Sequence, residues 1–121
     1  MTSPNELSER VGIYQDQIRV MGTLGFLDIA ASDELLMDDL DLFSHTMYHV
    51  IRNEKNRANL VGSPEHVTKL VALVESKMEA LSSEQAAKIE IAFAELGTII
   101  EDQLPGLMVL YPRLQEVRKK D

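Results

Sequence analysis

Apolar residues recur at intervals of mostly four and three residues in four separate stretches of this chain. These stretches run over 7–21, 36–50, 67–81 and 89–100. Because an α-helix has about 3.6 residues per turn, this spacing places the apolar side chains of each stretch along one face. No stretch shows the sustained two-residue alternation of a half-buried strand. The pattern therefore predicts an all-α protein with four amphipathic helices.

Capping residues and helix breakers divide the same four stretches from one another. A short polar residue, followed by proline or acidic residues, precedes each stretch and can cap the first turn of a helix. Gly22, Gly62 and the pair Pro105-Gly106 stand where the preceding helices should end. The four start signals are Ser3-Pro4-Asn5-Glu6, Ser32-Asp33-Glu34, Ser63-Pro64-Glu65 and Ser82-Ser83-Glu84-Gln85.

Four such helices predict a roughly antiparallel four-helix bundle, with residues 1–121 forming a single domain. The loop 22–31 contains four large apolar residues, so we expect it to carry a packed turn of its own. The second helix is predicted to fray in the polar run 53–59. The apolar segment 104–111 is predicted to pack across the end of the bundle as a short extra turn or helix.

The charge of the chain is strongly acidic and is concentrated in its first half. The net charge is −8 over 121 residues; residues 1–51 hold nine acidic and two basic residues, and residues 52–121 hold eleven and ten. This field disfavours nucleic acid and anionic membranes, and it favours a protein partner with a basic surface. There is no cysteine, no membrane-spanning apolar run and no signal-peptide pattern, so a cytoplasmic protein is expected.

The segment 38–52 holds the residues that most suggest chemistry. On a continuous helix with Phe43 turned to the core, a row of acidic and basic side chains lies about 160–240° away from it. That row therefore faces solvent, whereas the metal sites of helix bundles use ligands that project inward. We predict that this outer face binds a partner. Its residues are Asp38, Asp41, His45, His49 and Arg52.

Two other interpretations of the segment stay open. His45 and His49 are one turn apart, with Asp41 one turn earlier, so a surface zinc site is geometrically possible with further ligands from elsewhere. The run His49-Val50-Ile51-Arg52-Asn53 resembles the phosphoacceptor motif of histidine-phosphotransfer domains, although Asn53 stands where those domains usually have glycine. The resemblance implies a phosphoacceptor role for His49. The expectation favoured over both is that no metal and no cofactor is bound.

Sequence motifs of enzymes are missing from the chain. There is no Gly-x-Ser-x-Gly, no phosphate-binding glycine loop and no dinucleotide fingerprint. His66 is interpreted as an ordinary surface histidine. We therefore expect a non-catalytic protein-interaction module of the adaptor, chaperone, anti-activator, immunity or inhibitor type.

Several apolar residues lie off the predicted core stripes. They imply either an exposed patch, for a partner or a homodimer, or a bundle whose helices have wide core faces. Both interpretations remain open at this point. The residues are Ile13, Val20, Leu35, Met37, Leu42, Ile91 and Ile99.

Overall fold

The computed structural model describes residues 4–119, and this part of the chain is helical almost throughout and contains no β-strand. The all-α prediction is thus confirmed. Ser3 of the first predicted cap lies outside the described residues. The elements are α1 (Pro4–Met21), α2 (Thr23–Ala30), α3 (Glu34–Asp38), α4 (Leu40–Arg52), α5 (Glu54–Val61), α6 (Pro64–Lys77), α7 (Ser83–Gln103), the 3₁₀-helix η1 (Pro105–Val109) and α8 (Leu110–Arg118).

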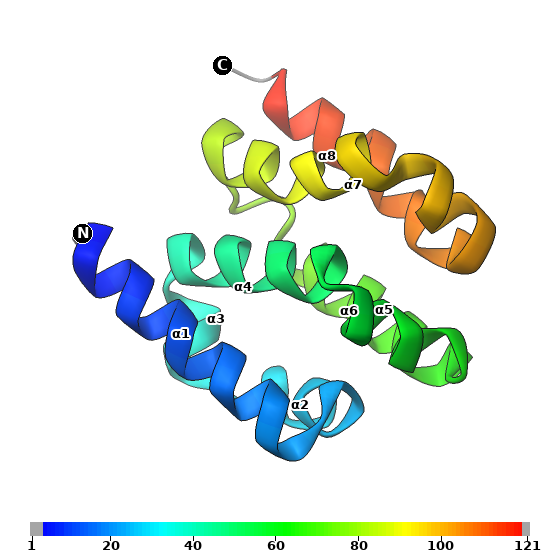
Figure 1. Ribbon diagram of the computed structural model, residues 1–121. Coiled ribbons are helices and arrows are strands. Elements are labelled where there is room, and N and C mark those ends of the chain that lie inside the picture. The colour runs from blue at the N-terminus through cyan, green and yellow to red at the C-terminus, as the bar shows by residue number, and fades with distance from the viewer. Residues whose placement is uncertain (1–3, 120–121) are drawn as a thin grey trace.

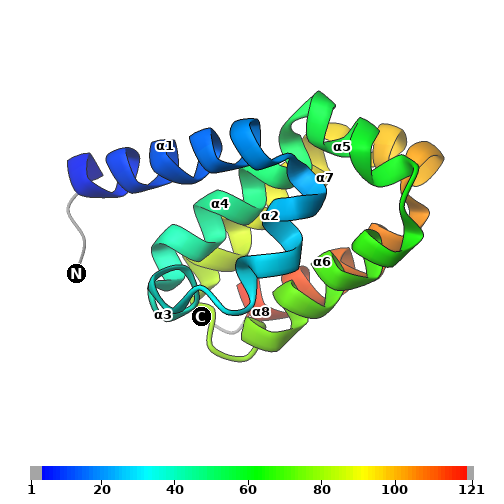
Figure 2. The same ribbon diagram turned by 90° about the horizontal axis from the view of Figure 1, so that it is seen from below.

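The helices form two rows that pack against each other. Figure 1 shows α1, α4 and α7 stacked one above another and running in the same direction, with α4 in the middle. The chain returns through α2, α6 and α8, which form the second row on the other side, as the view from below shows (Figure 2). The predicted antiparallel four-helix bundle is not confirmed, because the helices that flank α4 run parallel to it.

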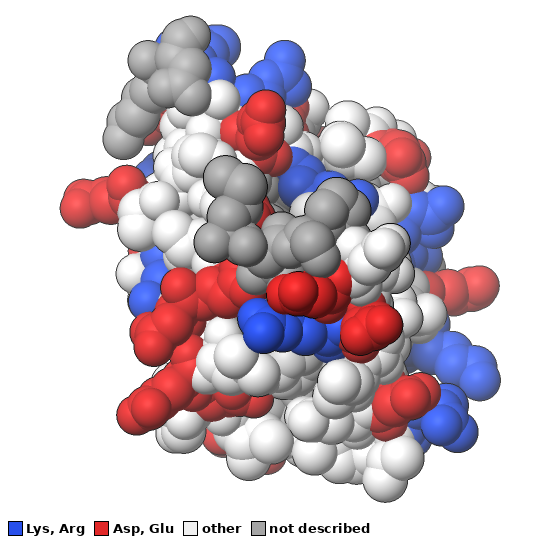
Figure 3. Space-filling model, turned by 90° about the vertical axis from the view of Figure 1, so that its left-hand side faces the viewer, with Lys and Arg blue, Asp and Glu red and all other residues white. Residues whose placement is uncertain are grey.

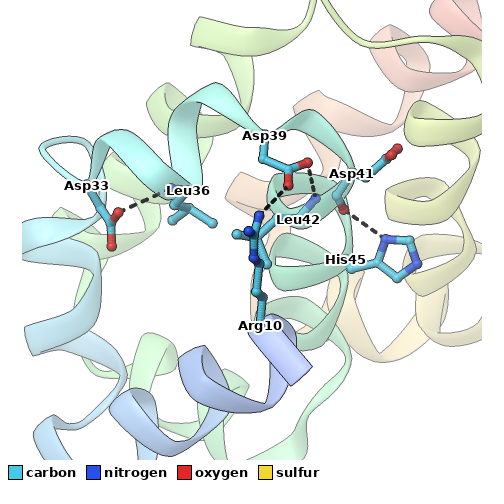
Figure 4. A network of polar contacts seen from close by, with 7 residues as sticks. All are labelled: Arg10, Asp33, Leu36, Asp39, Asp41, Leu42 and His45. Atoms are coloured by element: carbon cyan, nitrogen blue, oxygen red, sulfur yellow. Dashed lines mark hydrogen bonds and ion pairs between the residues drawn. The ribbon is translucent and has the colours of Figure 1, made fainter. Parts of the chain in front are cut away.

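The second predicted helix, expected to start near Ser32 and to fray within 53–59, is interrupted at Asp39. This residue has an extended backbone (φ −100°, ψ 98°), and its carboxylate accepts a hydrogen bond from the amide of Leu42. Figure 4 shows the same carboxylate reaching Arg10 on α1, 3.4 Å away. Asp33 caps α3 in the same manner through the amide of Leu36. A short polar side chain that bonds to the following backbone competes with helix continuation, so two helices replace one.

A second interruption at Asn53 makes the polar run a helix of its own. The side-chain oxygen of Asn53 accepts hydrogen bonds from the amides of Lys55 and Asn56, and α5 follows. The prediction that 53–59 would fray is therefore wrong. Buried Arg57 on α5 donates back to the carbonyls of Ile51 and Arg52, which are otherwise left open at the end of α4.

The segment 22–31, predicted to carry a packed turn, is helical, and the segment 104–111, predicted to pack as a short turn or helix, is helical as well. Loop 22–31 forms α2, which starts at Gly22 with a positive φ of 86°, a conformation that glycine adopts without strain. The segment 104–111 forms η1 and the start of α8, and Leu107 and Leu110 within it are fully buried. The helix start predicted at Ser82-Ser83-Glu84-Gln85 is confirmed, and Ser82 and Gln85 form a capping box there.

The core is built largely from the predicted stripes. Phe43, Met47 and Val50 of α4 are fully buried, since helices cover α4 on both sides. Met21 was predicted to face the core and is instead 42% exposed at the end of α1. Leu42, one of the off-stripe residues, is fully buried. Five other off-stripe residues are exposed, namely Ile13, Val20, Leu35, Ile91 and Ile99.

Candidate functional site

The five residues predicted to form one outward row are divided between two helices. Asp38 is the exposed last residue of α3, and the break at Asp39 separates it from the others. Asp41, His45, His49 and Arg52 remain on α4, but this side of α4 lies between α1 and α7, so that Arg52 is exposed and the other three are partly buried. The prediction of one continuous solvent-facing row is therefore wrong, because a continuous helix was assumed.

The two ends of the row on α4 are bonded to α7. The side-chain amide nitrogen of Gln85, Nε2, donates to the carboxylate of Asp41 at 2.8 Å. Arg52 forms an ion pair of 2.9 Å with Glu95, and both side chains are about half exposed. Between them, the ammonium group of Lys88 lies 4.2 Å from the ring centre of Tyr48. Asp41 and Arg52 thus help to align α4 with α7, and they are only partly available to a partner.

His45 and His49 face α1 instead. Nδ1 of His45 lies 2.9 Å from the carbonyl oxygen of Asp41, which only accepts, so Nδ1 carries the proton (Figure 4). His49 is half-buried, and its pKa lies below the ordinary value. Burial is the main cause, and the nearby positive charge of Lys88 and the neighbouring His45 lower the pKa further. At neutral pH the ring of His49 is therefore uncharged.

Two cavities lie between α1 and α4, and both are lined by Gln15 and His49. The larger has a volume of about 490 Å³ and extends over the start of α2 and over α5. The smaller, of about 410 Å³, is also lined by His45 and by apolar Leu7 and Val11 of α1. The histidines that the sequence suggested as a surface row thus line cavities between helices.

A chain of hydrogen bonds that the sequence did not suggest joins Ser63, His66 and Asp28. Nε2 of His66 lies 2.9 Å from the carboxylate of Asp28, and its Nδ1 lies 2.6 Å from the hydroxyl of Ser63. Lys69 binds the same carboxylate, and this is the main reason that the pKa of Asp28 is lowered. His66 is thus more than the ordinary surface histidine predicted from the sequence. Asp28 is 38 residues away, so no local pattern could have revealed the contact.

This arrangement has the residue types of a catalytic triad but not its surroundings. The amides of His66 and Val67, at the start of α6, are bonded to the carbonyl of Ser63, so they cannot stabilise an oxyanion. Neither of the two cavities is lined by Ser63 or His66. Its evident effect is to fasten α2 to α6.

Acidic side chains gather where the parallel helices begin. Glu6, Asp41 and Glu84 lie in the first turns of α1, α4 and α7, all of which start at the same end of the molecule. Exposed Glu34 and Asp38 of α3 add to them at that end. Figure 3 views this end and shows aspartate and glutamate side chains clustered around a few basic ones. We call these five residues the acidic end. The positive ends of the helix dipoles favour acids at such positions.

The described part of the chain contains no group of three or more histidine, aspartate or glutamate side chains placed to hold a metal ion. Within residues 4–119, no helix combines the length and the apolar character required to cross a membrane. Comparison with protein-family models, curated proteins and solved structures found no match.

Proposed function

We propose that this protein is a non-catalytic interaction module that binds a partner protein with a basic surface through its acidic end. The observation that carries the proposal is the convergence of the first turns of α1, α4 and α7, together with α3, on one acidic face (Figure 3). Two of the five residues predicted from the sequence, Asp38 and Asp41, belong to this surface. The other three, His45, His49 and Arg52, lie further along α4.

Exposed Leu35 supplies the apolar contact that such a surface needs. It follows Glu34 directly in α3, and 53% of its surface is accessible. Interface affinity usually comes from a few apolar or aromatic side chains that lose contact with water, whereas charges mainly set the association rate and the choice of partner. A basic surface with an apolar hollow would match Leu35 and its acidic surroundings.

The test is affinity capture with a charge-altered variant and a matched control. The variant carries Glu34→Gln, Asp38→Asn and Glu84→Gln, which are all exposed. The control removes the same number of charges elsewhere, through Glu65→Gln, Glu101→Gln and Asp102→Asn. Asp39 is left intact because it caps α4. We expect wild type and control to retain the same partner at low salt and the variant to lose it. Equal retention by all three proteins would contradict the proposal.

Histidine phosphotransfer, with His49 as the acceptor, is the second candidate. It is supported by the uncharged ring of His49, which leaves a nucleophilic nitrogen at neutral pH, and by the basic side chains Arg19 and Lys55 that line the same cavity. If it is correct, a phosphorylated response regulator labels the wild type and the control His45→Gln, but not His49→Gln. Absence of label in the wild type excludes this role.

A further inference from the structure

The larger cavity between α1 and α4 has a lining that differs in charge from the rest of the molecule. Arg19 of α1, Lys55 of α5 and the uncharged His49 of α4 contribute to its wall. None of the described residues that line it is an aspartate or a glutamate, in a chain with a net charge of −8. The cavity, of about 490 Å³, is large enough for a small organic molecule.

The two basic side chains are not fully neutralised by neighbouring acids. Arg19 has one contact with Asp16, where a single guanidinium nitrogen lies 3.4 Å from the carboxylate and both side chains are more than 70% exposed. The remaining guanidinium nitrogens stay available to a ligand. Lys55 is exposed and forms no ion pair with any of the described residues. The wall can thus supply two positive charges.

Internal hydrogen bonds orient the asparagine side chains of the wall. Nδ2 of Asn59 donates to the hydroxyl of Thr23 at 3.2 Å, and that hydroxyl donates to Oδ1 of buried Asn56 at 2.7 Å. The hydroxyl has a single donor hydrogen, and donating it to Oδ1 of Asn56 leaves its lone pairs free to accept from Asn59. The side-chain orientation of Asn53 is also fixed, because its Oδ1 accepts hydrogen bonds from two backbone amides at the start of α5.

The side-chain oxygens of Asn53 and Asn56 therefore accept hydrogen bonds within the protein, and their Nδ2 groups remain available as donors. The Nδ2 groups of both have no hydrogen-bond acceptor among residues 4–119, although Asn56 is only 8% exposed and both residues line the cavity. Asn53 is an exposed residue, and the Nδ2 atom of Asn56 keeps access to solvent, so both donors can bond to water or to a ligand in the cavity. Gly22 and Thr23, which begin α2 without a side-chain cap, lie in the same wall. A cavity with two cations and unpaired N–H donors is suited to an anion.

We propose that this cavity binds a small dianion, either a phosphate monoester or a dicarboxylate, between Arg19 and Lys55 with the amide donors of Asn53 and Asn56. Two positive charges match a dianion better than a monoanion, and the planar guanidinium can donate two parallel hydrogen bonds to either group. This proposal does not depend on a protein partner at the acidic end, because the cavity lies at the opposite end of α4.

The test measures binding to the full chain by isothermal titration calorimetry at constant ionic strength. The probes are inorganic phosphate, glycerol 3-phosphate and succinate, with acetate as the monoanion for comparison. We expect saturable millimolar or tighter binding of a dianion and weaker binding of acetate. Binding of the phosphates alone or of succinate alone identifies which of the two sources the site accepts. No saturable binding of any of the three dianions overturns the proposal.

The variant Asn53→Asp locates the site without removing the cap of α5. Aspartate caps helices as well as asparagine does, so the variant keeps its fold while a carboxylate oxygen replaces the Nδ2 donor at the cavity. We expect at least about tenfold weaker dianion binding. Asn5→Asp makes the same chemical change on α1, far from the cavity, and should bind as the wild type does. Equal affinity of Asn53→Asp and wild type, or equal loss in both variants, refutes the assignment.

Discussion

Asp39 offers the most direct test of how this sequence forms its helices. Its carboxylate caps α4 through the amide of Leu42 and also lies 3.4 Å from the guanidinium of Arg10. Asp39→Ala removes both interactions, whereas Asp39→Asn keeps an oxygen that can cap the helix and removes the negative charge. The two substitutions therefore separate the cap from the ion pair.

The expected costs follow from the surroundings of each interaction. Loss of an N-cap side chain lowers the free energy of unfolding by about 1 kcal/mol, within a range of about 0.5–2. The ion pair is long and partly exposed, with Arg10 37% and Asp39 19% accessible, so it adds about 0.5 kcal/mol or less. We expect Asp39→Ala to cost about 1–2 kcal/mol. Asp39→Asn and Arg10→Gln should each cost about 0.5 kcal/mol or less.

Urea unfolding, monitored by circular dichroism, measures these differences in free energy through the transition midpoints. The double variant Asp39→Asn with Arg10→Gln should lose no more free energy of unfolding than the two single variants lose in total. Both changes break the same ion pair, so the second change adds little to the first. The reasoning is refuted if Asp39→Asn destabilises as much as Asp39→Ala. It is equally refuted if Asp39→Ala leaves the free energy of unfolding unchanged.

Three further outcomes follow from burial and charge. Phe43→Ala in the middle of the core should lower the free energy of unfolding by about 3–5 kcal/mol. Val20→Ala on the exposed side of α1 should change it by no more than about 0.5 kcal/mol. Comparable losses for the two variants in urea unfolding would contradict this expectation. Because the pKa of His49 is lowered in the folded state, the unfolded chain binds more protons, so stability should fall as the pH decreases from about 7.5 through the ordinary value of 6.5 towards the lowered pKa. Thermal unfolding of His49→Gln should show a shallower decrease over that interval, and an identical slope would count against the assignment. Asp28→Asn should lower the melting temperature at low salt and less so at high salt, since its contacts with Lys69 and His66 are exposed and screened; a salt-independent loss would disagree.

Local periodicity predicted the helical class and most of the core positions. Phe43, Met47 and Val50 point to the core, and His45 and His49 do not, as the spacing on α4 indicated. This works because burial of an amphipathic face depends on residues within a few turns. Periodicity does not reveal which helix lies opposite that face, so the flanking of α4 by α1 and α7 could not be predicted.

The neighbours of the candidate site depend on contacts between residues far apart in the chain. The cavity forms where α1 meets α4 and α5, and Thr23 and Asn56 that join its wall are 33 residues apart. The bond between His66 and Asp28 spans 38 residues. Tertiary packing creates such pairs, and no spacing rule within a helix contains them. The site's residue types were visible in the sequence, but their grouping was not.

The helix break at Asp39 and the new helix that starts after Asn53, neither of which was predicted, decide both the fold and the candidate sites. Asp39 is a short polar residue within an apolar pattern that continues past it, whereas Asn53 begins the polar run 53–59. Each of the two side chains bonds to backbone amides of the following turn. The break at Asp39 detaches Asp38 from α4 and places it with α3 at the acidic end. The break at Asn53 starts α5, so that Lys55 and Asn56 meet Arg19 across the cavity. A substitution that restored a continuous helix at position 53 would therefore remove the amide donors and the wall of the cavity together, whereas one at position 39 would alter the acidic end.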